Sequence, residues 1–193
     1  IFPGRAHNLN ERRFWAGAGL DPKGDGGGGS ARQRLLILCH EKLGPKLAGP
    51  AIRALEIGRA LADEADVLLA ARAVEPGWEA PPGVAVYTWS PGEAGLRPLL
   101  ATADVVLALG QLVSDLPELQ DLGTPLIVDW YDPFALECLT QVAQVPAEVR
   151  PRVELLNQES LAIQARSGDF YLAASERQRD FWLGVLLAHG RVG

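Results

Sequence analysis

The stretch RLLILCHEKLGPKLAGPAIRALEIGRAL, residues Arg34–Leu61, joins an apolar run, a glycine-punctuated loop and an amphipathic segment. This order predicts a strand, a turn and the N-terminus of a helix, which together form a common binding site for a phosphate or another anion. The physical reason is that unpaired backbone N–H groups and the positive end of the helix dipole converge there. The stretch therefore predicts one βα unit with an anion site at its turn.

The helix is expected to begin at Gly49-Pro50, because Pro50 suits the first helical position and Gly49 can serve as the N-cap. Residues at helical spacing then predict a buried face (Ala51, Ala54, Leu55, Gly58, Leu61 and Ala62) and an opposite face (Arg53, Glu56 and Asp63). The loop between Gly44 and Gly49 is neither GxGxxG nor a Walker A sequence. A dinucleotide-binding or P-loop site is therefore poorly supported.

Further apolar runs alternate with helical patterns along the chain. The runs that predict strands are Leu35–Cys39, Val67–Ala70, Val84–Trp89, Val105–Leu109, Leu126–Val128 and Phe170–Ala173. Several are continuous rather than alternating, as expected for strands buried on both faces of a parallel sheet. The longest helix is expected at about Ala147–Arg166, with one face marked by Val149, Val153, Leu156 and Ile163. The pattern predicts an α/β, Rossmann-like doubly wound, mostly parallel sheet.

The composition predicts one soluble domain, since the 193 residues are 48% hydrophobic and 22% charged. A net charge of −6 argues against a nucleic-acid-binding surface. No apolar run approaches the roughly 20 residues that cross a bilayer, and no signal peptide is visible. Cys39 and Cys138 lie in apolar stretches without metal-ligand spacing. They predict reduced core residues of a cytoplasmic protein and no metal site.

The first 31 residues differ in composition from the rest of the chain. Residues 26–31 form a flexible Gly/Ser linker, and its GGGGS sequence is also the usual unit of engineered linkers. Two interpretations stay open: a natural tail, or a peptide of separate origin (residues 1–25) fused through this linker to a domain of residues 32–193. If this peptide docks on a partner or on the domain, Phe14 and Trp15 are its natural anchors.

Polar residues follow several of the predicted strands, where ligands bind in doubly wound sheets. His40 follows the first, Gly110-Gln111 the fourth, and Asp129-Trp130-Tyr131-Asp132 the fifth. Ser175 follows the sixth and predicts a helix start, with a capping box that closes on Gln178. Together these residues offer carboxylates, a base and aromatic rings for a polar ligand.

Three segments, CHEKLGPKLAGPAIRALEIGRALA, PLIVDWYDPFALE and DFYLAASERQRDFWLG, together resemble the N-terminal domain of GT-B glycosyltransferases of the family 4 (group 1) type. The resemblance covers roughly Arg34–Val192 and implies the acceptor-binding half of such an enzyme. The family's C-terminal half carries most contacts to the nucleotide-sugar, so we expect this chain to be inactive as an isolated fragment. The resemblance implies no resident cofactor, a nucleotide-sugar as co-substrate, and a glycan, lipid or small-molecule acceptor.

The resemblance also implies roles for individual residues. Gly44 and Gly49 would shape the loop that approaches the donor diphosphate, with Arg53 one helical turn in. Family members often have a histidine after the fifth strand, and here Asp132 takes its place, with Asp129 as a second candidate catalytic carboxylate. Candidate acceptor-binding residues are His40, Trp130, Tyr131 and Ser175. A retaining transferase needs no strong protein base if the leaving phosphate accepts the acceptor proton, while a carboxylate can orient hydroxyls.

Structural interpretations of the same residues stay open. Asp129 can cap the following turn, Asp132 can begin a turn at Pro133, and Ser175 can act only as an N-cap. Trp130 and Tyr131 can pack or stack on a sugar, because aromatic rings serve both purposes.

Two other function classes also stay open. One is a non-catalytic α/β protein-interaction module displayed with a tethered peptide, and the other is a different Rossmann-like enzyme, against which the missing GxGxxG counts. Expected partners are the second GT-B domain, the substrates, a protein or peptide partner through residues 1–25, and a membrane surface if the acceptor is a lipid. No nucleic acid is expected.

Overall fold

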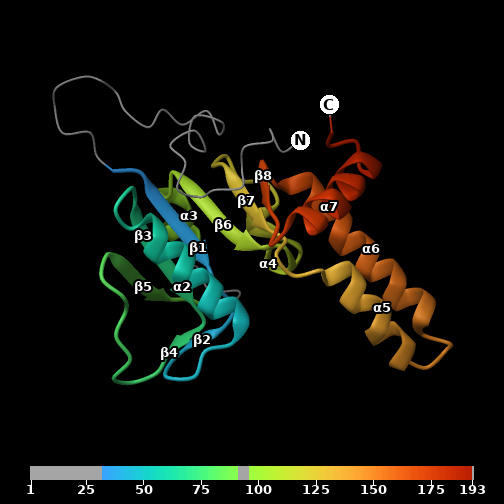
Figure 1. Ribbon diagram of the computed structural model, residues 1–193, viewed down its shortest axis with the longest axis horizontal. Coiled ribbons are helices and arrows are strands. Elements are labelled where there is room, and N and C mark those ends of the chain that lie inside the picture. The colour runs from blue at the N-terminus through green and yellow to red at the C-terminus, as the bar shows by residue number, and fades with distance from the viewer. Residues whose placement is uncertain (1–31, 91–95, 193) are drawn as a thin grey trace.

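The computed structural model describes residues 32–90 and 96–192, and its centre is a six-stranded parallel sheet (Figure 1). The strands are β1 (Arg34–Leu38), β3 (Asp66–Ala71), β5 (Val84–Thr88), β6 (Val105–Leu109), β7 (Leu126–Asp129) and β8 (Phe170–Leu172). Their spatial order is β5-β3-β1-β6-β7-β8, and every neighbouring pair is parallel. Counted along the chain, this is the 3-2-1-4-5-6 order of the Rossmann fold. The predicted fold class is confirmed.

Helices cover both faces of the sheet. They are α2 (Gly49–Leu61), α3 (Leu96–Thr102), α4 (Gly110–Asp115), the 3-10 helix η1 (Pro117–Leu119), α5 (Phe134–Gln144), α6 (Arg150–Ser167) and α7 (Glu176–Ala188). One core cluster joins α2 to one face, and a second joins α3, α4 and α7 to the other. A small parallel sheet of β2 (Lys42–Leu43) and β4 (Ala73–Val74) lies beyond the carboxyl ends of β1 and β3.

The predicted strands are all present, with ends that differ by at most one residue. Their continuous burial has the expected cause. In β1, residues Leu35, Leu36, Ile37 and Leu38 are all at most 2% exposed, because the two core clusters enclose alternate side chains of the same strand. No side chain of this run is left to face water, so no alternation appears in the sequence.

Helix α2 begins one residue earlier than predicted. Its N-cap is Ala48, which makes no side-chain cap hydrogen bond, so the expectation of Gly49 as N-cap is wrong. Pro50 lies in the first turn as expected, and the helix packs close to the sheet at Gly58. A Cβ atom there would lie 3.4 Å from the side chains of Val67 and Val84. The amides at the start of α2 are therefore left without a side-chain cap.

The long helix differs from the prediction in its start and in its buried face. Val149 is the N-cap of α6 and is 40% exposed, and Leu156 is 50% exposed. The fully buried positions are instead Gln164 and Ala165. The reason is that the face packed on the body includes Ser160 and Gln164, whose polar atoms are hydrogen-bonded to other side chains. A search for apolar residues at helical spacing cannot identify this buried face, because part of it is polar.

Several other expectations concern membranes, cysteines and the N-terminal residues. Among residues 32–90 and 96–192, no helix has both the length and the apolar character needed to cross a bilayer. Cys39 and Cys138 are buried free thiols, as predicted. Phe14, Trp15 and the linker of residues 26–31 lie outside the described residues.

Two glycine-to-alanine changes test how the structure uses its glycines. A Cβ atom at Gly168 would lie 2.5 Å from Cγ2 of Val128, whereas one at Gly184 in α7 would meet nothing within 4 Å. We expect Gly168→Ala to lower the free energy of unfolding by about 1–3 kcal/mol through overpacking. Gly184→Ala should raise it by up to about 1 kcal/mol, because alanine is the better helix former. Urea denaturation of both variants measures this, and equal effects would contradict the assignment.

Candidate functional site

A small cavity of about 80 Å³ lies at the carboxyl edge of the sheet. Its walls come from the ends of β1, β6 and β7, at His40, Leu109–Gln111 and Asp129–Asp132, and from Pro50, Phe134 and Gln164. The strand order reverses between β1 and β6. In open α/β sheets, the crevice outside the strand ends at this switch point is the usual ligand site. The cavity therefore lies where the fold favours ligand binding.

An ion pair connects α2 to the end of β7 beside this cavity. The Arg53 guanidinium donates two hydrogen bonds to the Asp129 carboxylate, from Nε to Oδ2 at 2.5 Å and from Nη2 to Oδ1 at 2.9 Å. The side chain of Asp129 is 2% exposed and that of Arg53 is 27% exposed. Burial raises the pKa of Asp129, while Arg53 and the backbone amide of Tyr131 oppose this shift. The expectation that Arg53 lies on the helix face opposite the core is corrected by this contact.

Tyr131 completes the arrangement. Its backbone N–H donates to Oδ1 of Asp129 at 3.2 Å, so Asp129 also caps the turn that follows β7. Its ring lies under the Arg53 guanidinium, with Cζ of Arg53 4.8 Å from the ring centroid. Its hydroxyl oxygen would lie 3.9 Å from a Cβ atom placed on Gly49, so this hydroxyl lies beside the first residue of α2. Burial and the negative charges of Asp132 and Asp129 raise the pKa of Tyr131.

The loop after β7 is held by three hydrogen bonds that link it to two elements, β8 and α7. The backbone N–H of Trp130 donates to the carbonyl oxygen of Leu172 at 2.8 Å. Nε1 of Trp182 donates to the carbonyl oxygen of Trp130 at 2.8 Å, and Nε2 of Gln178 donates to that of Tyr131 at 2.9 Å. Because both α7 side chains donate to backbone carbonyl oxygens, helix α7 fixes the backbone of the loop directly.

Beneath the loop, a buried polar network was not predicted from the sequence. Nε1 of Trp130 donates to Oε1 of Gln164 at 2.7 Å, and Nε2 of Gln164 donates to Oγ of Ser160 at 3.1 Å. Gly110 is enclosed by the same groups, since a Cβ atom there would lie 2.3 Å from Oε1 of Gln164. No sequence signal marks Gln164, because a glutamine on a helix is normally exposed. Gly110 was recognised only as a residue at a strand end.

Asp132 is the half-buried carboxylate of the cavity wall. It lies close to Glu137 in the first turn of α5, and the charge and hydrogen bonding of Asp132 raise the pKa of Glu137. His40, exposed on the other side of the cavity, has its Nε2 3.2 Å from Oε1 of Glu41. These groups offer hydrogen-bond acceptors and a base to a ligand that carries hydroxyl groups.

The structure thus brings together His40, Asp129, Trp130, Tyr131 and Asp132 around one cavity, with Gly49 and Arg53 beside Tyr131. Trp130 is 1% exposed and its ring is stacked on Trp182, with centroids 4.6 Å apart. In this conformation the ring is part of the core, which favours the packing interpretation of Trp130 over stacking on a sugar.

Four predicted site residues of the described chain do not line the cavity: Gly49 and Arg53, which lie beside Tyr131, and Gly44 and Ser175. Gly44 is buried, and a Cβ atom there would lie 2.6 Å from the carboxyl carbon of Glu75. Its packing role is therefore local to the small sheet. Ser175 is the N-cap of α7, where its Oγ accepts from the backbone N–H of Gln178 at 3.2 Å. In the part of the chain that the structure describes, no cluster of three or more His, Cys, Asp or Glu side chains could hold a metal ion.

The ion pair can be tested by removing one partner and then both. Arg53→Met leaves a buried carboxylate unpaired, and we expect it to lower the free energy of unfolding by about 3–5 kcal/mol at neutral pH. The double variant Arg53→Met/Asp129→Asn should recover at least half of this loss. Without Arg53, the folded-state pKa of Asp129 rises further, so the penalty should shrink as the pH falls toward the unfolded value of about 3.9.

A matched control for this test lies on the same helix. Arg59→Met removes an arginine that is 61% exposed and paired with Glu56, and such pairs contribute less than about 1 kcal/mol. Urea denaturation across pH 5–8 gives all three values. Equal losses in the single and the double variant would show that the buried charge is not what the pair compensates.

Comparisons with known proteins identify a distant structural similarity and no family. No protein-family model matches the chain, and no curated protein matches it. Among solved structures, the chain is similar to the glycosyltransferase SnogD from Streptomyces nogalater, with 20% sequence identity and a TM-score of 0.36. The similarity covers 80% of this chain and 44% of the SnogD chain, so this chain spans less than half of that protein's length. The fold assignment rests on the strand order of the chain itself.

Proposed function

We propose that the chain is the acceptor-binding domain of a nucleotide-sugar-dependent glycosyltransferase with a GT-B fold, of the family 4 (group 1) type. The observation that carries this proposal is the cavity at the switch point, which has the Asp132 carboxylate in its wall and the Arg53–Tyr131 pair beside it. The sequence resemblance supports the same function through segments that contribute to this wall. The acceptor is a glycan, a lipid or a small molecule that presents a hydroxyl group.

The chemistry at the cavity follows from which groups remain available. Asp132 accepts a hydrogen bond from the acceptor hydroxyl and orients its oxygen toward the sugar carbon. In a retaining reaction the departing phosphate takes the hydroxyl proton, so Asp132 positions the nucleophile without having to act as a strong base. His40 and Gln111, both in the cavity wall, bind further hydroxyl groups of the acceptor.

Asp129 has a different role in this proposal from the catalytic one that the resemblance implied. Its two carboxylate oxygens accept from Arg53 and from the Tyr131 amide, and the side chain is almost completely buried. We assign it as a positioning residue that orients Arg53. Among the described residues only Asp129 accepts a hydrogen bond from Arg53, which leaves guanidinium N–H groups for a donor phosphate near the uncapped start of α2.

The proposal includes a second α/β domain that binds most of the nucleotide-sugar. It places the enzyme in the cytoplasm, where free thiols such as Cys39 and Cys138 persist, with peripheral contact to a membrane if the acceptor is a lipid. No resident cofactor is part of the reaction. A peptide or protein partner that binds through residues 1–25 belongs to the alternative function as an interaction module.

Asp132→Asn in the two-domain enzyme tests the assigned role. We expect kcat/KM to fall by about a hundredfold, because the acceptor hydroxyl loses its orienting carboxylate. The thermal midpoint should stay within a few degrees of the parent value, since Asp132 is at the surface of the cavity. Asp121→Asn is the control, as Asp121 is exposed in the segment before the amino end of β7. Parent rates for Asp132→Asn would remove this carboxylate from the reaction.

The need for a donor domain gives a separate prediction. The chain of residues 1–193, incubated with a panel of nucleotide-sugars, should give neither transfer nor hydrolysis above background, because only part of the donor contacts would be present. The two-domain enzyme with the same panel is the positive control, followed by chromatography of the released nucleotide. Rapid turnover by residues 1–193 alone would overturn the division of labour between the two domains.

A further inference from the structure

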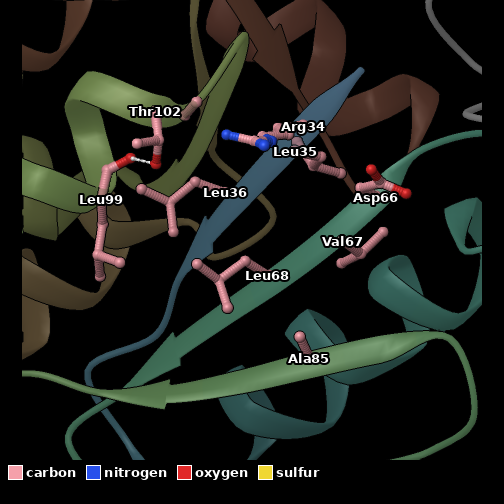
Figure 2. Close-up of a pocket in the computed structure, with 10 residues that line it drawn as sticks. Arg34, Leu35, Leu36, Asp66, Val67, Leu68, Ala85, Leu99 and Thr102 are labelled. Atoms are coloured by element: carbon pink, nitrogen blue, oxygen red, sulfur yellow. Dashed lines mark hydrogen bonds between the residues drawn. The ribbon is translucent and has the colours of Figure 1, made fainter. Parts of the chain in front are cut away.

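A second cavity lies at the opposite, amino edge of the sheet and takes no part in the proposed function (Figure 2). Its volume is about 240 Å³. Three strands form its floor and the last turn of α3 forms its wall, through Leu36, Leu68, Ala85, Leu99, Thr102 and Ala103. The Thr102 hydroxyl donates to the carbonyl oxygen of Leu99 at 3.0 Å, so it offers no unused donor to a ligand. Apart from the charged residues Arg34 and Asp66, the lining is therefore apolar.

This cavity marks a part of the sheet that the described helices leave uncovered. On the α2 side of β3, Val67 and Leu69 are at most 3% exposed. On the α3 side, Leu68 is only half-buried and Ala85 is exposed, and Tyr87, on the same side of β5, is 45% exposed. Helix α3 is only seven residues long and contacts β1. Since parallel sheets are normally covered on both faces, another group is expected to cover this one.

The N-terminal segment enters the body beside this cavity. Arg32 donates to the carbonyl oxygen of Ala62 at 2.6 Å and lies 3.9 Å from Asp66, and Asp66 and Arg34 are both cavity residues. From Trp15 to Arg32 the chain advances 17 residues. A glycine-rich chain of that length spans about 20–25 Å on average, which is enough to return Trp15 to the cavity.

The N-terminal segment contains aromatic side chains that suit an apolar cavity of this size. Phe14 and Trp15 are adjacent aromatic residues, and a dry cavity of about 150 Å³ already accepts a benzene ring.

We propose that Phe14 and Trp15 dock into this apolar cavity of their own chain, so that the N-terminal segment covers the open edge of the sheet. The docking is intramolecular, and the effective concentration of a segment on a short tether is of the order of 1 mM. If the free segment binds the cavity with a dissociation constant of about 0.1 mM, about nine tenths of the molecules are docked.

Trypsin provides the test, because Arg12 and Arg13 border the aromatic pair and Lys23 lies in the same segment outside it. Cleavage rates at these sites are measured by mass spectrometry in the chain of residues 1–193 and in a free peptide of residues 1–31. We expect cleavage after Arg12 and Arg13, relative to Lys23, to be about tenfold slower in the chain than in the peptide, from the docked fraction above. The protection should not change when the protein is diluted.

Two variants remove the docking in different ways. Phe14→Ser/Trp15→Ser removes the anchors without touching the described fold, and Ala85→Trp fills the cavity from an exposed floor position. In both variants, the rate of cleavage after Arg12 and Arg13 relative to Lys23 should return to the value in the free peptide. Thr88 is exposed on the other side of β5, so Thr88→Trp should keep the protection. Thermal denaturation shows that each variant is folded.

Three outcomes would overturn the proposal. They are an unprotected site in the parent chain, protection that survives both Ala85→Trp and the double serine variant, and protection that disappears on dilution. The last would mean that the segment occupies the cavity of a second copy. The test measures no transferase activity, so its result is independent of the proposed function.

Discussion

The ion pair between Arg53 and Asp129 fixes the relation between α2 and the end of β7, and the geometry of the candidate site depends on it. A buried carboxylate is unfavourable unless it is paired and hydrogen-bonded, and Asp129 is both. Its pairing in turn orients Arg53 over the Tyr131 ring and holds the Tyr131 amide. Three residues from two elements are thereby placed at the switch point, although only part of this set is open to solvent.

Support for this arrangement comes from below the sheet edge. Gln164 and Ser160 of α6 bring polar atoms into the body, where Trp130 and Ser114 satisfy them. Trp182 and Gln178 of α7 hold the backbone of the same loop. A buried network of this kind stabilises one conformation only when every member is satisfied. Gly110 cannot carry a side chain there, because a Cβ atom would clash with the Gln164 and Trp130 side chains. The site is thus built on rigid elements, as precise positioning of substrates requires.

The two edges of the sheet serve different purposes in this chain. The carboxyl edge combines charged, aromatic and amide groups around a small cavity, whereas the amino edge has a larger, apolar one. This difference follows from parallel topology. All strands end at the carboxyl edge in loops that are free to vary, while at the amino edge the helices return to the strands and Arg32 leads into β1. Among the described helices, the short α3 leaves part of that edge uncovered.

The sequence by itself determined the strands, their parallel arrangement and the position of α2, because continuous apolar runs and the Gly49-Pro50 start are local signals. It also pointed to the strand ends at His40 and Asp129–Asp132, which the cavity brings together. Only the tertiary structure decided which side chains the residues at this site contact. Arg53 was expected on the outer face of α2, Trp130 was a candidate sugar platform, and Gln164 drew no attention. Each outcome depends on contacts between residues 34 to 76 positions apart, and no local pattern records such a contact.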